Sequence, residues 1–314
     1  MNITTLLTTI ATLALLLLTG FIGGKTKILD EVSTERLSTL ILKIGQPFLI
    51  IGSFFGLEYS QENLKTGFLI LALGLCMNAG MAALAFFFAK PIRDMDERKL
   101  SEFSMFFSNC GFVGFPILYS IMGEIGLFYG AFYLVSYNLF VWTWGLVILA
   151  RGRRDIKITP KKIILNFGTL PCVIGILLFS INVPIPEYVK ELASYLGGLC
   201  TPISMLIAGA NIARRSLKKM LTSGKVYWVS AVKLLIMPII VTLVTWALGL
   251  PDYMVIFGCV MAAMPGPTVV TMFGEMYRIS PGYAAELVGA STIMSVVTIP
   301  PMVMLAEWLV QFAV

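Results

Sequence analysis

Long apolar runs dominate the chain and constrain its fold more than any other feature. Residues 5–24, 64–89 and 225–248 are three of them, and 58% of all residues are hydrophobic while only 13% are charged. A helix needs about 20 apolar residues to cross the hydrocarbon core of a bilayer. Since a backbone group without a partner is costly in lipid, such runs fold as helices. The pattern therefore predicts an all-α polytopic membrane protein.

Ten such spans can be marked, joined by short loops that leave no room for a soluble domain. The first span lacks the basic segment that precedes the apolar core of a signal peptide, so we expect it to be retained as a transmembrane helix. The predicted spans cover residues 5–24, 34–57, 64–89, 101–122, 126–150, 161–181, 188–212, 225–248, 253–274 and 281–310.

Lysine and arginine residues gather in alternate loops. The loops after the first, third, fifth, seventh and ninth spans hold almost all of them, whereas the other four loops contain only Lys65 and Lys190. Cytoplasmic loops carry such an excess, so we expect these five loops in the cytoplasm and both termini outside the plasma membrane. Topology thus explains the net charge of +6, and we expect no nucleic acid partner.

Two spans contain proline and glycine near their middle. The fourth includes NCGFVGFP at 109–116, and the ninth includes AAMPGPTVVT at 262–271. Proline inside a helix removes a hydrogen bond and costs about 3 kcal/mol, and glycine weakens the helix further. Because proline suits the first turn of a helix, we expect a new half-helix to begin at Pro116 and another at Pro267. The alternative is that both prolines only kink their helices.

The two halves of the chain resemble each other. FPILYSIMGE (115–124) aligns with GPTVVTMFGE (266–275), and IGQPFLI (44–50) aligns with LCTPISM (199–205), each time with proline on proline. Five spans in a repeat is an odd number, so the second copy must enter the membrane inverted. We therefore expect two inverted five-helix repeats, residues 1–155 and 156–314, as in many secondary transporters.

Four stretches carry a family resemblance that covers nearly the whole chain. They are residues 24–53, NCGFVGFP, PISMLIAGANI (202–212) and STIMSVVTIP (291–300). In their order and spacing the chain resembles prokaryotic members of the auxin efflux carrier family. The resemblance implies a scaffold of spans 1, 2, 6 and 7, and a moving transport domain of spans 3–5 and 8–10 whose broken fourth and ninth helices cross. It also implies organic anions such as auxin, malonate or malate as substrates, and a homodimer formed through the scaffold.

Breaks at these prolines would expose backbone N–H groups in the middle of the membrane. Both half-helix N-termini would point at the crossing, each with about half a positive charge, and such ends bind anions without a basic side chain. The residues assigned to this candidate substrate site are Asn109, Gly111, Gly114, Pro116, Asn138, Pro265, Gly266, Pro267, Thr268 and Ser291, with Lys43 from the second span.

Several of these residues also have a purely structural interpretation. The polar side chains of Asn109, Asn138 and Ser291 either bind a carboxylate or form hydrogen bonds between packed helices, and the glycines are interpreted as allowing a close helix crossing. Lys43 lies about 14 Å of helix rise from the cytoplasmic end of its span, where it either faces the substrate or snorkels to water. Lys233 lies nearer the start of its span, so we expect it to snorkel.

The residue types that are absent from the spans reduce the number of possible functions. The chain has no histidine, its five cysteines lie in apolar spans without a CxxC pair, and no span carries Asp or Glu near its middle. We therefore expect no metal site and no cofactor, and cation coupling is disfavoured. An intramembrane enzyme would need a Ser–Lys pair, which no spacing in the sequence indicates, so we expect no enzyme.

Together these features predict a secondary transporter that moves a small organic anion across the membrane by elevator-type alternating access. Since the cell interior is negative, export of a monoanion gains about 2.3 kcal/mol per 100 mV, and efflux would need no coupled ion. A membrane sensor or receptor for a small molecule on the same fold is the alternative. The expected partners are the small organic anion and the lipid bilayer.

The loop charges predict which substituted cysteines are accessible from outside. With the five native cysteines replaced, Glu62→Cys should react with a membrane-impermeant maleimide in intact cells, because its loop is expected outside. Lys218→Cys should react only after the cells are permeabilised. Labelling in the reverse pattern would overturn the topology.

Overall fold

The computed structural model describes residues 3–153, 166–214 and 222–311, and within these ranges the chain forms helices and no strand. Four π-helical turns, Ile41–Gly45, Cys110–Gly114, Val141–Gly145 and Val232–Ile236, connect consecutive α-helices. The α-helices are α1 (Ile3–Lys25), α2 (Glu31–Leu40), α3 (Gln46–Gly52), α4 (Gln61–Phe88), α5 (Met95–Phe106), α6 (Phe115–Met122), α7 (Glu124–Phe140), α8 (Leu146–Ala150), α10 (Thr169–Ser180), α11 (Glu187–Gly198), α12 (Cys200–Ala213), α14 (Gly224–Ala231), α15 (Met237–Ala247), α16 (Asp252–Ala263), α17 (Val269–Met276) and α18 (Pro281–Gln311).

Described helices overlap the predicted spans. Two of these spans contain shorter apolar helices, α10 and α16, and a third contains α2 and α3. A multi-pass membrane protein is thereby confirmed, while the start of span 161–181, the repeat boundary at 155 and both chain ends lie outside the described residues. Among the described residues, seven helical segments are long and apolar enough to cross a membrane, namely Thr4–Lys25, Gln61–Phe88, Met95–Met122, Glu124–Ala150, Glu187–Ala213, Gly224–Ala247 and Pro281–Gln311.

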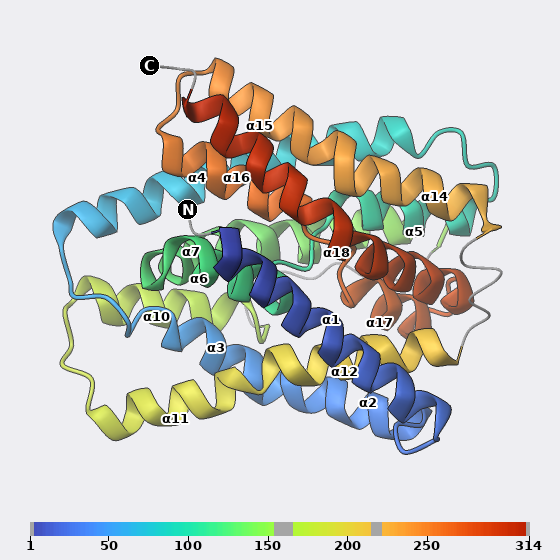
Figure 1. Cartoon of the computed structure of the whole chain (residues 1–314), viewed down its shortest axis with the longest axis horizontal. Coiled ribbons are helices and arrows are strands. Elements are labelled where there is room, and N and C mark those ends of the chain that lie inside the picture. Colours follow the sequence, from blue (N-terminus) through green and yellow to red (C-terminus); the bar gives the residue numbers. More distant parts are fainter. Residues whose placement is uncertain (1–2, 154–165, 215–221, 312–314) are drawn as a thin grey trace.

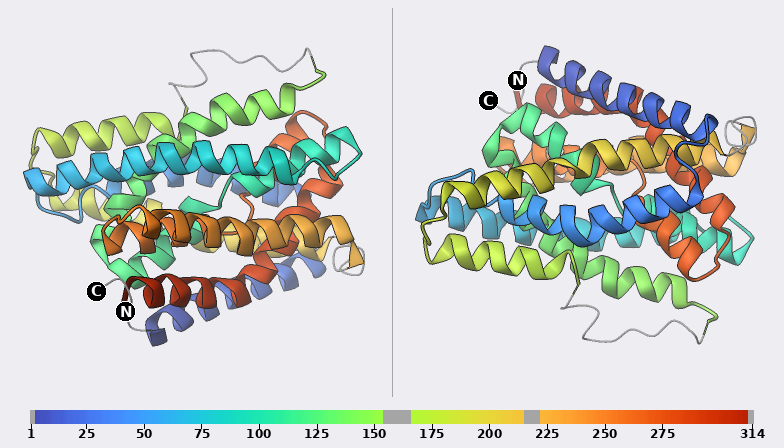
Figure 2. Two further views of the ribbon diagram at one scale, coloured as in Figure 1. Left: turned by 90° about the horizontal axis from the view of Figure 1, so that it is seen from above. Right: turned by 90° about the horizontal axis from the view of Figure 1, so that it is seen from below.

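Most helices run along one common direction, as both views of Figure 2 show. The start of α1 and the end of α18 lie at the same end of the bundle (Figures 1 and 2). The start of α2, the end of α12 and the start of α14 lie at the opposite end (Figure 1). Lys25 and Lys27 at the end of α1, Arg214 at the end of α12 and Lys225 at the start of α14 therefore belong to the end away from the beginning of α1 and the end of α18.

Side-chain caps mark where several helices begin. Asp30, Ser60 and Asp94 precede α2, α4 and α5, and each side chain accepts a hydrogen bond from the backbone N–H three residues further on, at 2.7, 3.0 and 2.9 Å. Such caps satisfy one of the free donors of a helix start. Hydrogen bonds from Ser33 hold the pKa of the Asp30 carboxyl below its usual value. The polar residues between the apolar runs thus fix the helix ends.

Glycine lets α1 and α12 pack backbone against backbone, side by side in Figure 1. A Cβ atom added at Gly20 would lie 2.3 Å from the carbonyl oxygen of Leu206, and one added at Gly209 would lie 2.0 Å from that of Leu17. Gly24, one turn after Gly20, approaches α12 in the same way, so the contact follows the small-xxx-small pattern of membrane helices.

Three of the four described π-helical turns end two residues before a proline. Gly45 precedes Pro47, Gly114 precedes Pro116, and Ile236 precedes Pro238 by this spacing. A proline lacks the N–H that a regular α-helix would use and clashes with the carbonyl one turn back. The wider turn relieves that clash, so these prolines are accommodated in helices that continue through them.

The α1–α12 contact predicts that Gly209→Leu destabilises the protein by about 2 kcal/mol or more, because a side chain there forces the two backbones apart. The matched control is Gly198→Leu, at the end of α11, where an added Cβ meets no atom within 4 Å. Both changes raise helix propensity equally. Unfolding in detergent should separate the two variants, and equal stability would contradict the proposed contact.

Candidate functional site

Two helices are interrupted, and their interruptions touch. Residues 107–109 separate α5 from the helical turn that leads into α6, and residues 264–268 separate α16 from α17. The backbone N–H of Asn109 donates a hydrogen bond of 2.8 Å to the carbonyl oxygen of Pro265. In lipid, a backbone group that has no partner within its own helix needs a hydrogen-bond partner elsewhere in the protein. Here the second interruption provides the acceptor for a backbone donor of the first.

The first interruption does not lie where the sequence predicted it. We expected a half-helix to begin at Pro116, but Phe107 already has an extended backbone and Pro116 is the second residue of α6. The π-helical turn Cys110–Gly114 carries the chain into α6, with the Gly114 N–H 3.1 Å from the carbonyl oxygen of Asn109. In the ninth span, α17 begins two residues after Pro267, close to the predicted position.

The second interruption is held by α18. The N–H of Gly266 donates to the Ser291 hydroxyl at 3.1 Å, and that hydroxyl donates to the carbonyl oxygen of Leu287 at 2.8 Å. A Cβ atom added at Gly266 would lie 2.6 Å from the Ser104 hydroxyl of α5. Gly266 is therefore required for the close approach of these three segments.

The two other glycines assigned to the site differ from each other. A Cβ atom added at Gly114 would lie 3.0 Å from the terminal methyl of Met261, so Gly114 lies in a tight contact between the interrupted helices. A Cβ atom added at Gly111 would meet no atom within 4 Å. The interpretation that Gly111 allows a close crossing is therefore wrong.

Lys233 is fully buried, with none of its surface exposed, so the prediction that it snorkels to water is wrong. Its ammonium donates a hydrogen bond to the hydroxyl of Ser108, which lies inside the first interruption and is itself buried. This is a Ser–Lys pair that the sequence spacing did not indicate. Neither residue lines the large cavity described next, so the Ser108 hydroxyl is closed to a molecule in that cavity.

A cavity of about 980 Å³ lies between α2, α7, α12 and α17. Its lining includes three of the predicted site residues, Lys43, Asn138 and Thr268, together with Phe112 from the turn before α6. Thr268 directly precedes the first residue of α17, so the start of this half-helix faces the cavity. The predicted residues that do not line it are Asn109, Gly111, Gly114, Pro116, Pro265, Gly266, Pro267 and Ser291.

Asn138 has a free hydrogen-bond donor beside this cavity. The residue is 5% exposed, and its side-chain nitrogen has no hydrogen-bond partner within the part of the chain that the structure describes. A Cβ atom added at Gly168 would lie 2.4 Å from the Asn138 side-chain oxygen, so the amide packs directly on the backbone before α10. A buried donor without a partner is uncommon, and a ligand in the cavity would satisfy it.

Arg214 lines the same cavity at the end of α12. Its guanidinium donates to the carbonyl oxygen of Leu29 at 3.3 Å, to the Thr34 hydroxyl at 2.9 Å and to the side-chain oxygen of Asn211. All three acceptors are neutral, so Arg214 contributes a positive charge to the wall while it fastens the start of α2 to α12.

Sequence reasoning missed several residues of this region. Tyr137 and Ser204 also line the cavity, and Ser108 with Lys233 supports the first interruption. A hydroxyl in an apolar helix is common and carries little signal. The depth of Lys233 in its span was the one usable sign, since a charge far from water is costly.

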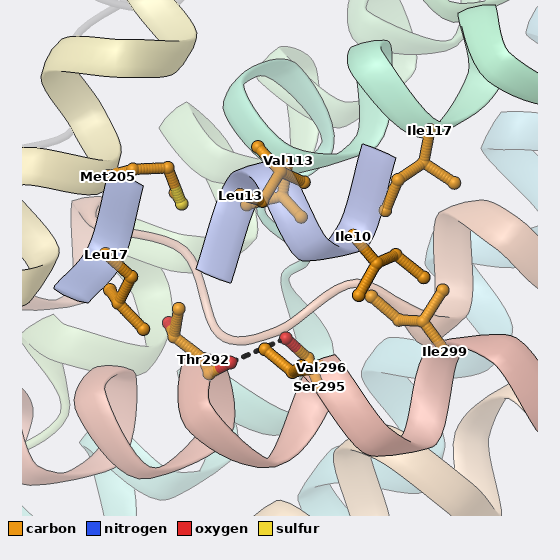
Figure 3. A pocket seen from close by; sticks show the side chains of 10 residues that line it. All are labelled: Ile10, Leu13, Leu17, Val113, Ile117, Met205, Thr292, Ser295, Val296 and Ile299. Atoms are coloured by element: carbon orange, nitrogen blue, oxygen red, sulfur yellow. Dashed lines mark hydrogen bonds between the residues drawn. The ribbon is translucent and has the colours of Figure 1, made fainter. Parts of the chain in front are cut away.

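A second, much smaller cavity lies between α1, α6, α12 and α18 (Figure 3). It measures about 20 Å³, which is room for about one water molecule. The hydroxyl of Ser295 points to the carbonyl oxygen of Thr292 at 2.8 Å, so it is already paired within α18 (Figure 3). The remaining walls are aliphatic or methionine side chains, namely Ile10, Leu13, Leu17, Val113, Ile117, Met205, Val296 and Ile299, and we regard this space as a packing gap.

Comparison with known proteins identifies the class to which this architecture belongs. Residues 5–163 and 153–303 match the model of a family described as membrane transport protein. The chain is 22% identical over 296 residues to an uncharacterized transporter of Methanothermobacter thermautotrophicus, covering 93% of this chain and 95% of the relative. It is 25% identical over 214 residues to an uncharacterized transporter of Methanocaldococcus jannaschii, covering 65% and 68%. The chain therefore belongs to the auxin efflux carrier-like family of membrane transport proteins.

Proposed function

We propose that the protein is a secondary transporter for a small organic anion that carries a carboxylate. The large cavity supports this proposal, because its lining combines the start of α17, the unpartnered amide of Asn138 and the ammonium of Lys43. The start of a helix carries about half a positive charge and exposed N–H groups. Each of these three groups favours an anion and requires no cofactor or metal ion, and the carboxylates of Glu31, Glu35 and Glu275 line other parts of the same cavity wall.

In this proposal residues 1–155 and 156–314 form two inverted five-helix repeats. Spans 1, 2, 6 and 7 form the scaffold, and spans 3–5 and 8–10 form the transport domain whose interrupted helices cross. The family model supports the division, since its two matched segments meet at residues 153–163. The α1–α12 contact lies within the proposed scaffold, and a homodimer would form through that scaffold.

The position of the cavity suggests an inward-facing state. It is lined by the start of α2 and the end of α12, at the end of the bundle where α1 ends with Lys25 and α14 begins beside Lys225 (Figure 1). By the positive-inside rule this end is cytoplasmic, and both termini lie outside the plasma membrane. An elevator movement of the transport domain would then expose Asn138 and the start of α17 outside, while Lys43 stays with the scaffold, and the membrane potential would drive efflux of the anion.

Two other functions are less well supported. A membrane sensor or receptor on the same fold would bind the same anion without moving it, so flux across a membrane separates it from a transporter. The Ser108–Lys233 pair has the groups of a hydrolase dyad, but both side chains are buried and lie outside the cavity lining. A nucleophile needs access to its substrate, which this arrangement does not provide.

The first test is flux of radiolabelled organic acids in proteoliposomes. Lys43→Gln should weaken carboxylate transport by about tenfold, since it removes one favourable charge and leaves the backbone donors. Lys43→Glu and Asn138→Asp should each weaken it further, because they add a repulsive charge in a poorly screened place.

Lys65→Glu is the matched control, because Lys65 is exposed on α4 and does not line the cavity. It should transport at the rate of the unchanged protein. Binding without flux would indicate a receptor. Flux unaffected by Lys43→Glu and Asn138→Asp would reject the proposed site.

The two prolines should differ in their effect on transport. Pro267→Ala should lower the rate at least about tenfold, because alanine lets α17 begin earlier and moves its free N–H groups away from the cavity at Thr268. Pro116→Ala should lower it less than about threefold, since contacts of Asn109 and Ser108 maintain the first interruption. Initial rates per folded carrier provide the comparison, and a larger effect of Pro116→Ala would contradict this account.

A further inference from the structure

Lys233 lies in the middle of a membrane-spanning segment, Gly224–Ala247, within the π-helical turn that joins α14 to α15. None of its surface is exposed, and its ammonium bonds to the Ser108 hydroxyl. Within residues 3–153, 166–214 and 222–311, no carboxylate forms an ion pair with it. A buried charge in a bilayer is expensive and needs a physical reason.

The other buried charges of the described chain are balanced. Glu102 on α5 accepts two hydrogen bonds from the guanidinium of Arg151, one of them 2.9 Å long. Lys99 pairs with Asp96 at 3.0 Å. Lys233 is thus the one buried charge in the described residues whose neutralising partner is not a side chain.

Helix ends stabilise the ammonium instead. Ser108 lies two residues beyond the last residue of α5, and the interruption that follows α16 is bonded to the same segment through Asn109 and Pro265. The end of a helix carries about half a negative charge on its free carbonyls. Two such ends together balance about one positive charge, so the interruptions account for a charged lysine at this position.

Lys233 belongs to the part of the molecule that holds the interruptions. Its turn packs against α5, α16 and α18, and α18 also holds Gly266 through Ser291. Lys43 by contrast lies between α2 and α3, and α3 packs on α10 and α11. If the interrupted helices move across the membrane, Lys233 moves with them, and Lys43 stays behind.

We propose that Lys233 travels with the substrate and cancels one negative charge during translocation. This inference rests on the elevator-type transport proposed above. The site then crosses the membrane with a net charge of zero when it carries a monocarboxylate, of minus one with a dicarboxylate, and of plus one when empty. The return of the empty carrier is therefore the voltage-dependent step of monocarboxylate efflux, and one charge still crosses in each full cycle.

The membrane potential distinguishes the movement of the loaded carrier from the return of the empty carrier, because the two steps carry different net charges. A step that moves one charge across 100 mV changes its equilibrium about 50-fold, and its rate about sevenfold when the barrier lies midway. Exchange with saturating substrate on both sides uses only the loaded carrier, whereas net efflux also needs the empty one. Proteoliposomes with a potential set by potassium and valinomycin allow both to be measured, with indole-3-acetate as the monocarboxylate and malonate as the dicarboxylate.

We expect monocarboxylate exchange to change less than about 1.5-fold per 100 mV, and net efflux or malonate exchange to change several-fold. Lys233→Met should make monocarboxylate exchange voltage-dependent, while Lys233→Arg, which keeps the charge, should not. Strong voltage dependence of monocarboxylate exchange in the unchanged protein would overturn the inference even if Lys233→Met failed to fold. Voltage-independent exchange in Lys233→Met would overturn it as well. Flux of neither acid would reject transport itself, and the role of Lys233 with it.

Discussion

The hydrogen bond from the backbone N–H of Asn109 to the carbonyl oxygen of Pro265 joins the two interruptions of helical structure within the membrane-spanning part of the chain. An interrupted helix leaves backbone donors and acceptors without partners, and each costs several kcal/mol in lipid. One interruption alone would carry most of that cost. Two interruptions that meet share this cost, and the Ser291 hydroxyl of α18 accepts a hydrogen bond from the Gly266 N–H. Lys233, from the turn between α14 and α15, bonds to the Ser108 side chain beside the first interruption. The donors that face the cavity at the start of α17 therefore depend on all of these segments at once.

We propose that this dependence divides the molecule into two mechanical parts. Around the interruptions, Gly114 and Gly266 allow close packing, Ser291 bonds to the backbone of Gly266, and Lys233 bonds to the side chain of Ser108. A set of contacts in which each member requires the others favours movement as one body. On the other side, α1 and α12 are joined through glycine and backbone contacts that leave no space for a side chain. The cavity lies between these parts, where a change in their relative position would alter access to it.

Apolar runs of about 20 residues indicate membrane-spanning helices directly, so a multi-pass membrane protein could be predicted from the sequence. The second interruption could be predicted as well, because two prolines and a glycine at 265–267 together weaken a helix. The first interruption was misplaced for a different reason. A π-helical turn accommodates Pro116, while the helix actually ends where Asn109 meets Pro265 and Ser108 meets Lys233. These partners are more than one hundred positions apart in the chain, so local propensity contains no information about them. The same limit explains Gly111, whose surroundings only the folded chain defines.

The surroundings of the two intramembrane lysines, Lys43 and Lys233, could be predicted from the sequence only in part. Both lie several turns inside a span, and the presence of Lys225 near the start of α14 suggested that Lys233 could reach the same water. Eight residues of helix separate these two lysines by about 12 Å of rise and turn them toward different faces. Lys225 accordingly pairs with Glu97 at the surface, whereas Lys233 extends to Ser108 in the interior. A positive charge at this depth is tolerated only where the surrounding protein provides a negative potential. The C-terminal ends of the interrupted helices provide such a potential. The buried lysine and the interrupted helices therefore lower each other's cost in lipid, because the helix ends carry negative potential and the ammonium bonds to Ser108 beside one of them.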